Sequence, residues 1–129
     1  MEFHHIGFVV SSVSDSINNF KKLYGLCNET EIYEDLIQKV KVAFLTDLNN
    51  NIKIELIEPI GEQSPVFKTC QNGGGLVNKC YQVEDIEKAC LELQEKGVKL
   101  ICPPVPGAGH GNARVAFFIQ GRIAQRTHF

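Results

Sequence analysis

His5-Ile6-Gly7-Phe8-Val9-Val10, close to the start of the chain, aligns with Asn78-Lys79-Cys80-Tyr81-Gln82-Val83 when the sequence is shifted by 73 residues (78 − 5). The same shift aligns Val42-Ala43-Phe44-Leu45 with Val115-Ala116-Phe117-Phe118. Two separate segments that share one offset indicate an internal repeat, in which each copy is one supersecondary unit. We therefore expect the chain to hold two copies of one module.

Each copy is expected to begin with a short apolar strand and to continue into an amphipathic helix. The helices are predicted over residues 13–24 and 86–96, with buried faces formed by Val13, Ile17, Phe20 and Tyr24 and by Ile86, Ala89, Cys90 and Leu93. Gly25 and Gly97 are expected to end these helices. Ser14, and Glu84 or Asp85, are expected to satisfy free amides at the helix starts.

Strand patterns follow each predicted helix. They cover residues 31–33, 40–46 and 52–57 in the first copy and residues 99–102, 113–119 and 122–127 in the second. Residues 47–51 are typical of a hairpin turn, and their counterpart around Gln120-Gly121 is shorter. This difference is expected to shift the last strands to an offset of 70, so that Glu55 corresponds to Gln125 (125 − 70 = 55).

These patterns predict an α+β fold in which two βαβββ modules form a cupped mixed β-sheet with flanking helices. The 129 residues are expected to form a single domain, with module one at about 1–60, a linker at about 61–74 and module two at about 75–129. Gly73-Gly74-Gly75 is interpreted as a flexible turn into the second module, since no Lys-Ser or Lys-Thr follows it as in a phosphate-binding loop.

Composition excludes some partners. A formal net charge of −2 at pH 7 does not favour electrostatic capture of nucleic acid or an anionic membrane. The longest apolar runs fall far short of the roughly 20 residues that a membrane helix needs. The odd number of cysteines, without a CxxC pair or a signal-peptide pattern, indicates reduced thiols and a cytoplasmic protein.

Four polar residues are expected to line the cup, because equivalent positions of the two modules would face each other there. In Ile54-Glu55-Leu56 the carboxylate points away from its apolar neighbours, so Glu55 faces the cup if the neighbours face the helix. His5 is expected to do the same from the first strand. The repeat adds Asn78 and Gln125 as their counterparts.

Imidazole and carboxylate are good ligands for zinc, nickel, cobalt, manganese or iron. His5 and Glu55 are therefore the candidate metal ligands. The amides of Asn78 and Gln125 offer only neutral oxygens, which weakens the predicted affinity if they complete the set.

The chain resembles the vicinal oxygen chelate superfamily, which includes glyoxalase I, bleomycin-resistance proteins and methylmalonyl-CoA epimerase. The resemblance lies in the order of several segments along the whole chain: His4-His5-Ile6-Gly7, residues 54–59, residues 61–66, Gly73-Gly74-Gly75-Leu76, and Pro103-Pro104 before His110-Gly111.

The resemblance implies a divalent metal that polarises a substrate carbonyl, with ligands at His5, Glu55, Asn78 and Gln125. Two of these positions carry amides where relatives have His and Glu. The position of the epimerase's proton-shuttling Glu aligns near Ile37, with Gln38 one residue on, and neither side chain is a base. Glu55 and Gln125 remain candidate catalytic residues, and Asn78, Gln125 and His110 are candidate substrate-binding residues. The loop that carries His110 is either a lid over the cup or an ordinary surface loop.

Three functions are consistent with this pattern. The first is an isomerase or lyase of the epimerase and glyoxalase type, acting on a small carbonyl compound or CoA thioester with a weakened or absent metal site. The second is a non-catalytic small-molecule binding or resistance protein. The third is metal-free isomerisation or ring formation, with Asn78 and Gln125 contacting the substrate. The resemblance also implies a homodimer.

Overall fold

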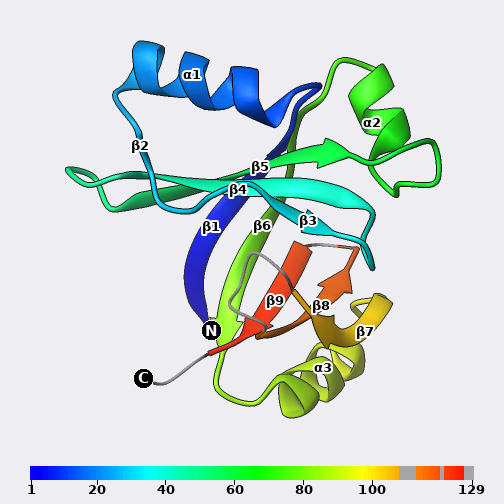
Figure 1. Cartoon of the computed structure of the whole chain (residues 1–129). Coiled ribbons are helices and arrows are strands. Elements are labelled where there is room, and N and C mark those ends of the chain that lie inside the picture. The colour runs from blue at the N-terminus through cyan, green and yellow to red at the C-terminus, as the bar shows by residue number, and fades with distance from the viewer. Residues whose placement is uncertain (108–112, 120, 127–129) are drawn as a thin grey trace. The chain divides into compact units, whose positions relative to one another are not determined.

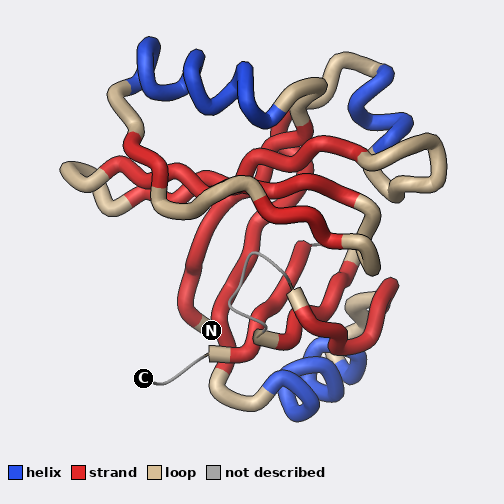
Figure 2. The backbone as a smooth tube through the Cα atoms, viewed as in Figure 1, coloured by secondary structure: helices blue, strands red, loops and turns tan. Residues whose placement is uncertain are grey.

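The computed structural model describes residues 1–107, 113–119 and 121–126. These residues form two compact units. The first module is His5–Val77, and the second module is Met1–His4 together with the described residues from Asn78 onward. Each module contains strands and a long amphipathic helix (Figures 1 and 2). The α+β class and the two repeated modules expected from the sequence are confirmed.

The first module is built on three long strands. They are β1 (Glu2–Val9), β4 (Val40–Asp47) and β5 (Ile52–Pro59). β5 lies between them, parallel to β1 and antiparallel to β4. The short strands β2 (Cys27–Asn28) and β3 (Tyr33–Asp35) both pair with β4.

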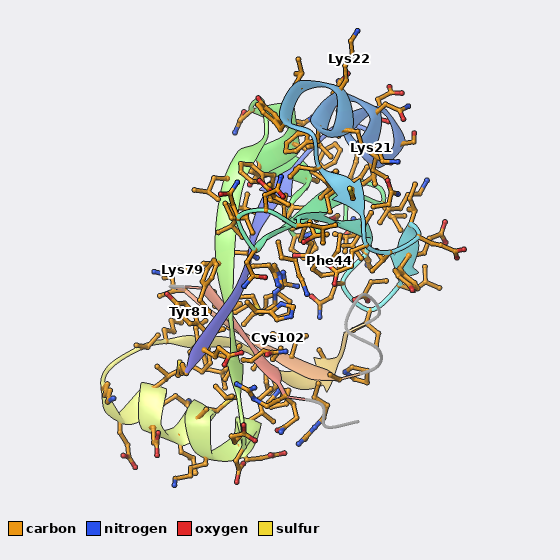
Figure 3. All side chains as sticks on the ribbon, turned by 90° about the vertical axis from the view of Figure 1, so that its left-hand side faces the viewer. Lys21, Lys22, Phe44, Lys79, Tyr81 and Cys102 are labelled. Atoms are coloured by element: carbon orange, nitrogen blue, oxygen red, sulfur yellow. The ribbon has the colours of Figure 1, made fainter. Side chains whose placement is uncertain are left out.

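Helix α1 (Val13–Tyr24) covers one face of these strands. Its buried face packs with residues of β4 and β5 in a cluster of Val13, Ile17, Leu26, Ala43, Leu45 and Leu56. Ser12, rather than the predicted Ser14, caps the helix by accepting from the Asp15 amide. Gly25 ends it in a left-handed conformation, as expected. Lys22 projects from the outer side of the helix (Figure 3).

The second module repeats this plan. Its strands are β6 (Gly75–Val83), β7 (Leu100–Pro106), β8 (Arg114–Phe118) and β9 (Gly121–Gln125). β9 is parallel to β6 and antiparallel to β8, and β7 pairs with β8. Helix α3 (Ile86–Glu95) is capped by Asp85 and packs with Ala116, Phe118 and Ile123. The second module therefore repeats the plan of the first, with the one strand β7 between its helix and its last two strands where the first module has β2 and β3.

The connector between the modules contains a short helix that the sequence patterns did not predict, α2 (Phe67–Gln71). It has only five residues, too few for the apolar periodicity that predicts a helix from sequence. After this helix, Gly74 adopts a φ of +71°, and a Cβ there would lie 2.4 Å from the Val9 carbonyl oxygen. The glycine turn is therefore required by close backbone contact with β1.

Strand pairing corrects the predicted repeat register. Gly7 pairs with Glu55 in the first module, and its counterpart Cys80 pairs with Arg122 in the second. The last strands are therefore offset by 67 residues (122 − 55) rather than 70. The error arose because the second hairpin is tighter than expected, with Phe118 paired directly with Gly121. Arg122, not Gln125, is the counterpart of Glu55.

All five cysteines, which lie within the described residues, carry free thiols. Among residues 1–107, 113–119 and 121–126, no helix combines the length and the apolar character required to cross a membrane.

Candidate functional site

His5 and Glu55 form a buried pair in the first module. Ile54 and Leu56 pack against the α1 cluster, so Glu55, between them, points to the opposite face, as predicted. His5 reaches Glu55 from the neighbouring strand β1, with Nε2 3.4 Å from Oε1. The side chains are 0% and 1% exposed. The parallel pairing of β1 and β5 therefore brings an imidazole and a carboxylate together in the interior.

Phe44 supplies an apolar wall to this pair. It pairs with Glu55 across β4 and β5. Its ring meets the imidazole of His5 edge to face, with centroids 5.0 Å apart and planes at 86°. Figure 3 shows Phe44 on the side of the strands away from α1. Apolar surroundings strengthen electrostatic interactions between the imidazole and the carboxylate, because little water screens them.

The side-chain amide of Gln125 forms hydrogen bonds at the start of helix α3. Its Oε1 accepts a hydrogen bond from the Ile86 amide at 2.9 Å, and its Nε2 donates to the Glu84 carbonyl. In the first module Glu58 Oε1 accepts from the Val13 amide at 2.8 Å. Gln125 is thus the counterpart of Glu58. Its amide is hydrogen-bonded at the start of helix α3, and its predicted roles as metal ligand, catalytic group and substrate contact stay predictions.

Arg122 is the residue that sequence reasoning missed. It is 7% exposed and lies on the face of β9 opposite Ile123, which packs against α3. Its Cζ is 5.4 Å from the ring centroid of Phe117, the counterpart of Phe44. Counting outward from a tight hairpin that pairs Phe118 with Gly121 would have aligned Arg122 with Glu55.

Asn78 shares the Arg122 face of the second module. It lies two residues before Cys80, the strand partner of Arg122, and so points to the same side of the strands. Within the described part of the chain its buried Oδ1 has no hydrogen-bond partner. The predicted contact of Asn78 with a ligand is untested. His110 falls outside the described residues.

The residues present do not fit a divalent metal. Catalytic zinc sites use three protein ligands and one open position. In residues 1–107, 113–119 and 121–126 there is no group of three or more His, Cys, Asp or Glu side chains that could hold a metal. His5 and Glu55 are two donors already paired with each other, and the position equivalent to Glu55 in the second module carries a cation.

A shallow groove of about 580 Å³ lies beside α3 in the second module. Glu2, Glu84, Lys88 and Arg126 are among the residues that line it. Arg126 is ion-paired there with Glu2 at 3.1 Å and with Glu84 at 2.7 Å. This groove is an open, salt-bridged surface on the α3 side of the second module, and its lining includes neither Arg122 nor Asn78.

Comparison with known proteins identifies the family. Residues 4–117 match the Glyoxalase/Bleomycin resistance protein/Dioxygenase superfamily, and the chain belongs to this superfamily. A crystal structure of a hypothetical protein from Bacillus halodurans C-125 superposes with a TM-score of 0.86 at 31% identity, covering 99% of this chain and 96% of that one. Members of the superfamily typically bind a divalent metal, in contrast to the donor set described above.

Several relatives are epimerases. The ethylmalonyl-CoA/methylmalonyl-CoA epimerase of Cereibacter sphaeroides is 41% identical over 75 residues, covering 56% of this chain and 54% of the relative. The mitochondrial methylmalonyl-CoA epimerase of Dictyostelium discoideum is 27% identical over 112 residues, covering 85% of this chain and 66% of the relative. The chain thus spans 54% to 66% of the length of these epimerases. A Streptomyces coelicolor methylmalonyl-CoA epimerase bound to 2-nitronate-propionyl-CoA shares the fold, with a TM-score of 0.83 and 19% identity over 99% of each chain.

Proposed function

We propose that the chain binds a small carbonyl compound, with CoA thioesters as the preferred class, and moves a proton at the carbon beside the carbonyl. The observation that carries the proposal is the buried pair of His5 and Glu55, 3.4 Å apart. Imidazole and carboxylate are the commonest general acids and bases in enzymes. The names of the epimerase relatives support the substrate class.

The step needs a base and an acid. Glu55, as a carboxylate, takes the proton from the α-carbon, and the electron pair moves onto the carbonyl oxygen as an enolate. Protonated His5 then returns a proton to carbon, and the proton held by Glu55 passes to His5 across the 3.4 Å gap. Atoms and charge balance over the cycle, and both side chains are restored.

Geometry favours one stereochemical outcome. His5 and Glu55 extend from the same face of adjacent parallel strands, so they approach a bound carbon from one side. Inversion of configuration would require a second proton donor on the opposite side of that carbon. The pair therefore supports exchange or isomerisation with retention, rather than epimerisation by two opposed bases.

The proposal is tested by exchange of the α-proton of methylmalonyl-CoA in D₂O, followed by NMR, with configuration determined separately. We expect catalysed exchange with retention in the wild type and a loss of about 100-fold or more in Glu55→Gln, the usual cost of a lost general base. Glu58→Gln, which keeps an acceptor for the Val13 amide, is the matched control and should exchange normally. Absence of exchange in the wild type, or equal rates in Glu55→Gln, overturns the proposal.

A second candidate is a binding protein without catalysis, and the burial of His5 and Glu55 favours it. At 0% and 1% exposure, these side chains touch a ligand only after surrounding groups move. A binder should take up methylmalonyl-CoA with equal affinity in the wild type and Glu55→Gln, without exchange in either. Calorimetry together with the exchange assay separates the two functions. A homodimer stays a prediction of the family resemblance, and a cytoplasmic location stays a prediction from the cysteine pattern.

A further inference from the structure

Tyr33, on the short strand β3, lies on the same face of the first module as Glu55. It pairs with Val42 of β4, and antiparallel strand partners direct their side chains to the same side of a sheet. Val42 belongs to the buried cluster that includes Ile57, whereas its neighbour Ala43 packs with α1. Glu55 is two residues before Ile57 on β5 and so lies on the same side as Ile57. Tyr33 and Glu55 therefore share the face of the strands away from α1.

The strand register sets how far Tyr33 stands from Glu55. β4 lies between β3 and β5, so that Val42 pairs with Tyr33 on one side and with Ile57 on the other. Neighbouring strands are about 4.8 Å apart and Glu55 is two residues from Ile57, which places the Cα atoms of Tyr33 and Glu55 roughly 12 Å apart. An acyl group bound across Phe44, the strand partner of Glu55, would meet the carboxylate at one end and the phenol at the other.

Tyr33 is both held in place and accessible. Asp35, two residues further along β3, is 8% exposed, and its Oδ1 accepts hydrogen bonds from the amides of Ile37 and Gln38 at 3.1 and 2.9 Å. These bonds close the turn from β3 to β4 and help to fix the register of β3. Tyr33 is 40% exposed, whereas Glu55 is 1% exposed. A ligand can therefore touch the phenol before it reaches the buried pair.

The second module has an apolar residue at the equivalent place. Val115 is the counterpart of Val42 (115 − 42 = 73), and its partner on β7 is Val105. Val105 packs against the small buried cluster that contains Val115. Packing at this position therefore does not require a hydroxyl, and the phenol is found in the module that also carries the imidazole and the carboxylate.

The proposed proton transfer creates a negative charge on an oxygen atom of the substrate. Removal of the α-proton by Glu55 moves the electron pair onto the carbonyl oxygen, and the proton of His5 is used to restore the carbon. The described His, Cys, Asp and Glu side chains do not assemble a metal site, so the enolate oxygen needs a hydrogen-bond donor. A tyrosine hydroxyl is one of the donors that stabilise such oxyanions.

We propose that the hydroxyl of Tyr33 donates a hydrogen bond to the carbonyl oxygen of the bound acyl compound and stabilises the negative charge that develops there. Because this charge arises in the proposed proton transfer, the role of Tyr33 rests on the proposed function. The O–H bond of Tyr33 is kept throughout, and the proton that moves is the one passed between Glu55, His5 and carbon.

The test compares the wild type, Tyr33→Phe and Tyr24→Phe in exchange of the α-proton of methylmalonyl-CoA in D₂O, with affinity measured by calorimetry. Tyr24, a 64% exposed tyrosine at the end of α1, is the matched control. We expect Tyr33→Phe to lose about 100-fold in exchange rate, the usual loss on removal of one oxyanion donor, while its affinity for methylmalonyl-CoA changes little. Tyr24→Phe should match the wild type.

Equal exchange rates in the wild type and Tyr33→Phe overturn the role of Tyr33 and leave the proposed function standing. A lower rate that is explained entirely by weaker binding of methylmalonyl-CoA also overturns it, because the hydroxyl would then serve only to bind the substrate.

A second titration decides the role of Tyr33 if the wild type exchanges no α-proton. The probe is the nitronate of 2-nitropropionyl-CoA, which carries its negative charge on oxygen atoms as an enolate does. A loss of affinity of about tenfold or more in Tyr33→Phe but not in Tyr24→Phe, as expected for one hydrogen bond to a charged group, supports the hydrogen bond even though the proposed function has failed. Equal affinity in the three proteins, or no binding by the wild type, overturns it.

Discussion

Glu58 and Gln125 accept the same hydrogen bond in the two modules. Glu58 Oε1 accepts from the amide of Val13, the first residue of α1, and Gln125 Oε1 accepts from the amide of Ile86, the first residue of α3. The first amides of a helix have no partner within the helix, so a side chain from the last strand of the module satisfies one of them. Each helix is thereby tied to the strand beneath it.

We therefore predict that Glu58→Ala and Gln125→Ala each destabilise the fold by about 1–2 kcal/mol, as the loss of a helix cap does. Chemical denaturation measures the effect, and Glu62→Ala, at an exposed position before α2, is the control. If Gln125→Ala keeps full stability but loses ligand binding, the helix-anchoring role is wrong and the original assignment of Gln125 to a site is restored.

Loss of only one member of the buried His5–Glu55 pair should lower the free energy of unfolding by a large amount. Removing one member of a buried ion pair costs about 3–5 kcal/mol because the other is left uncompensated. We expect Glu55→Leu to be destabilised by about 3 kcal/mol, and His5→Phe combined with Glu55→Leu to be less destabilised than the sum of the single variants.

A surface pair provides the comparison for this prediction. Lys88 and Glu92 are 74% and 53% exposed and 4.0 Å apart on α3. Loss of this pair in Glu92→Gln should change the free energy of unfolding by less than about 0.5 kcal/mol.

Additive effects of the His5 and Glu55 variants would show that the two side chains do not interact.

The sequence predicted the regular elements well and the site only in part. Residues 13–24 form α1 as expected, because the apolar spacing and Gly25 both mark the helix. Glu55 was placed on the correct face because strict alternation with Ile54 and Leu56 fixes its direction. In these cases local pattern and tertiary packing agree.

The register of β9 could not be predicted from the same patterns. Arg122, Ile123 and Ala124 are all buried, so this strand shows no alternation between buried and exposed residues from which to read its faces. Turn length then decides the register, and the tight turn ending at Gly121 was assigned three residues too long. The error aligned Gln125, instead of Arg122, with Glu55. Helix α2 was missed because its five residues are too few to show a helical period.

Gly74 offers a test of the close contact between the glycine turn and β1. A Cβ at this position would lie 2.4 Å from the Val9 carbonyl oxygen, whereas a Cβ at Gly25, with a similar φ of +68°, would meet nothing within 4 Å. Gly25→Ala should cost about 1 kcal/mol of backbone strain, and Gly74→Ala clearly more, because the chain must also move. Thermal unfolding measures both. Equal losses of stability in Gly25→Ala and Gly74→Ala would mean that the turn at Gly74 moves away from β1 without cost.

The more buried a cysteine thiol is, the more slowly it should react. Burial raises the pKa of the Cys90 thiol, with the nearby Glu87 charge adding to the effect, so less thiolate is present at neutral pH. Cys27 is exposed. We expect iodoacetamide to label Cys27 first and Cys90 only slowly, with Cys90 labelling rising at higher pH. Peptide mass spectrometry of a time course measures this. Rapid labelling of Cys90 at neutral pH would show that α3 opens readily.

Metal independence is the central claim, and the most direct test is elemental analysis of protein purified without a metal-affinity tag, followed by calorimetric titration with cobalt, nickel, manganese and zinc. Because His5 and Glu55 provide only two donors, we expect the purified protein to contain no stoichiometric metal. We also expect the titrations to show no metal binding that depends on His5. Near-stoichiometric binding of any of these ions that is abolished by His5→Ala would contradict the account and restore the metal chemistry of the superfamily.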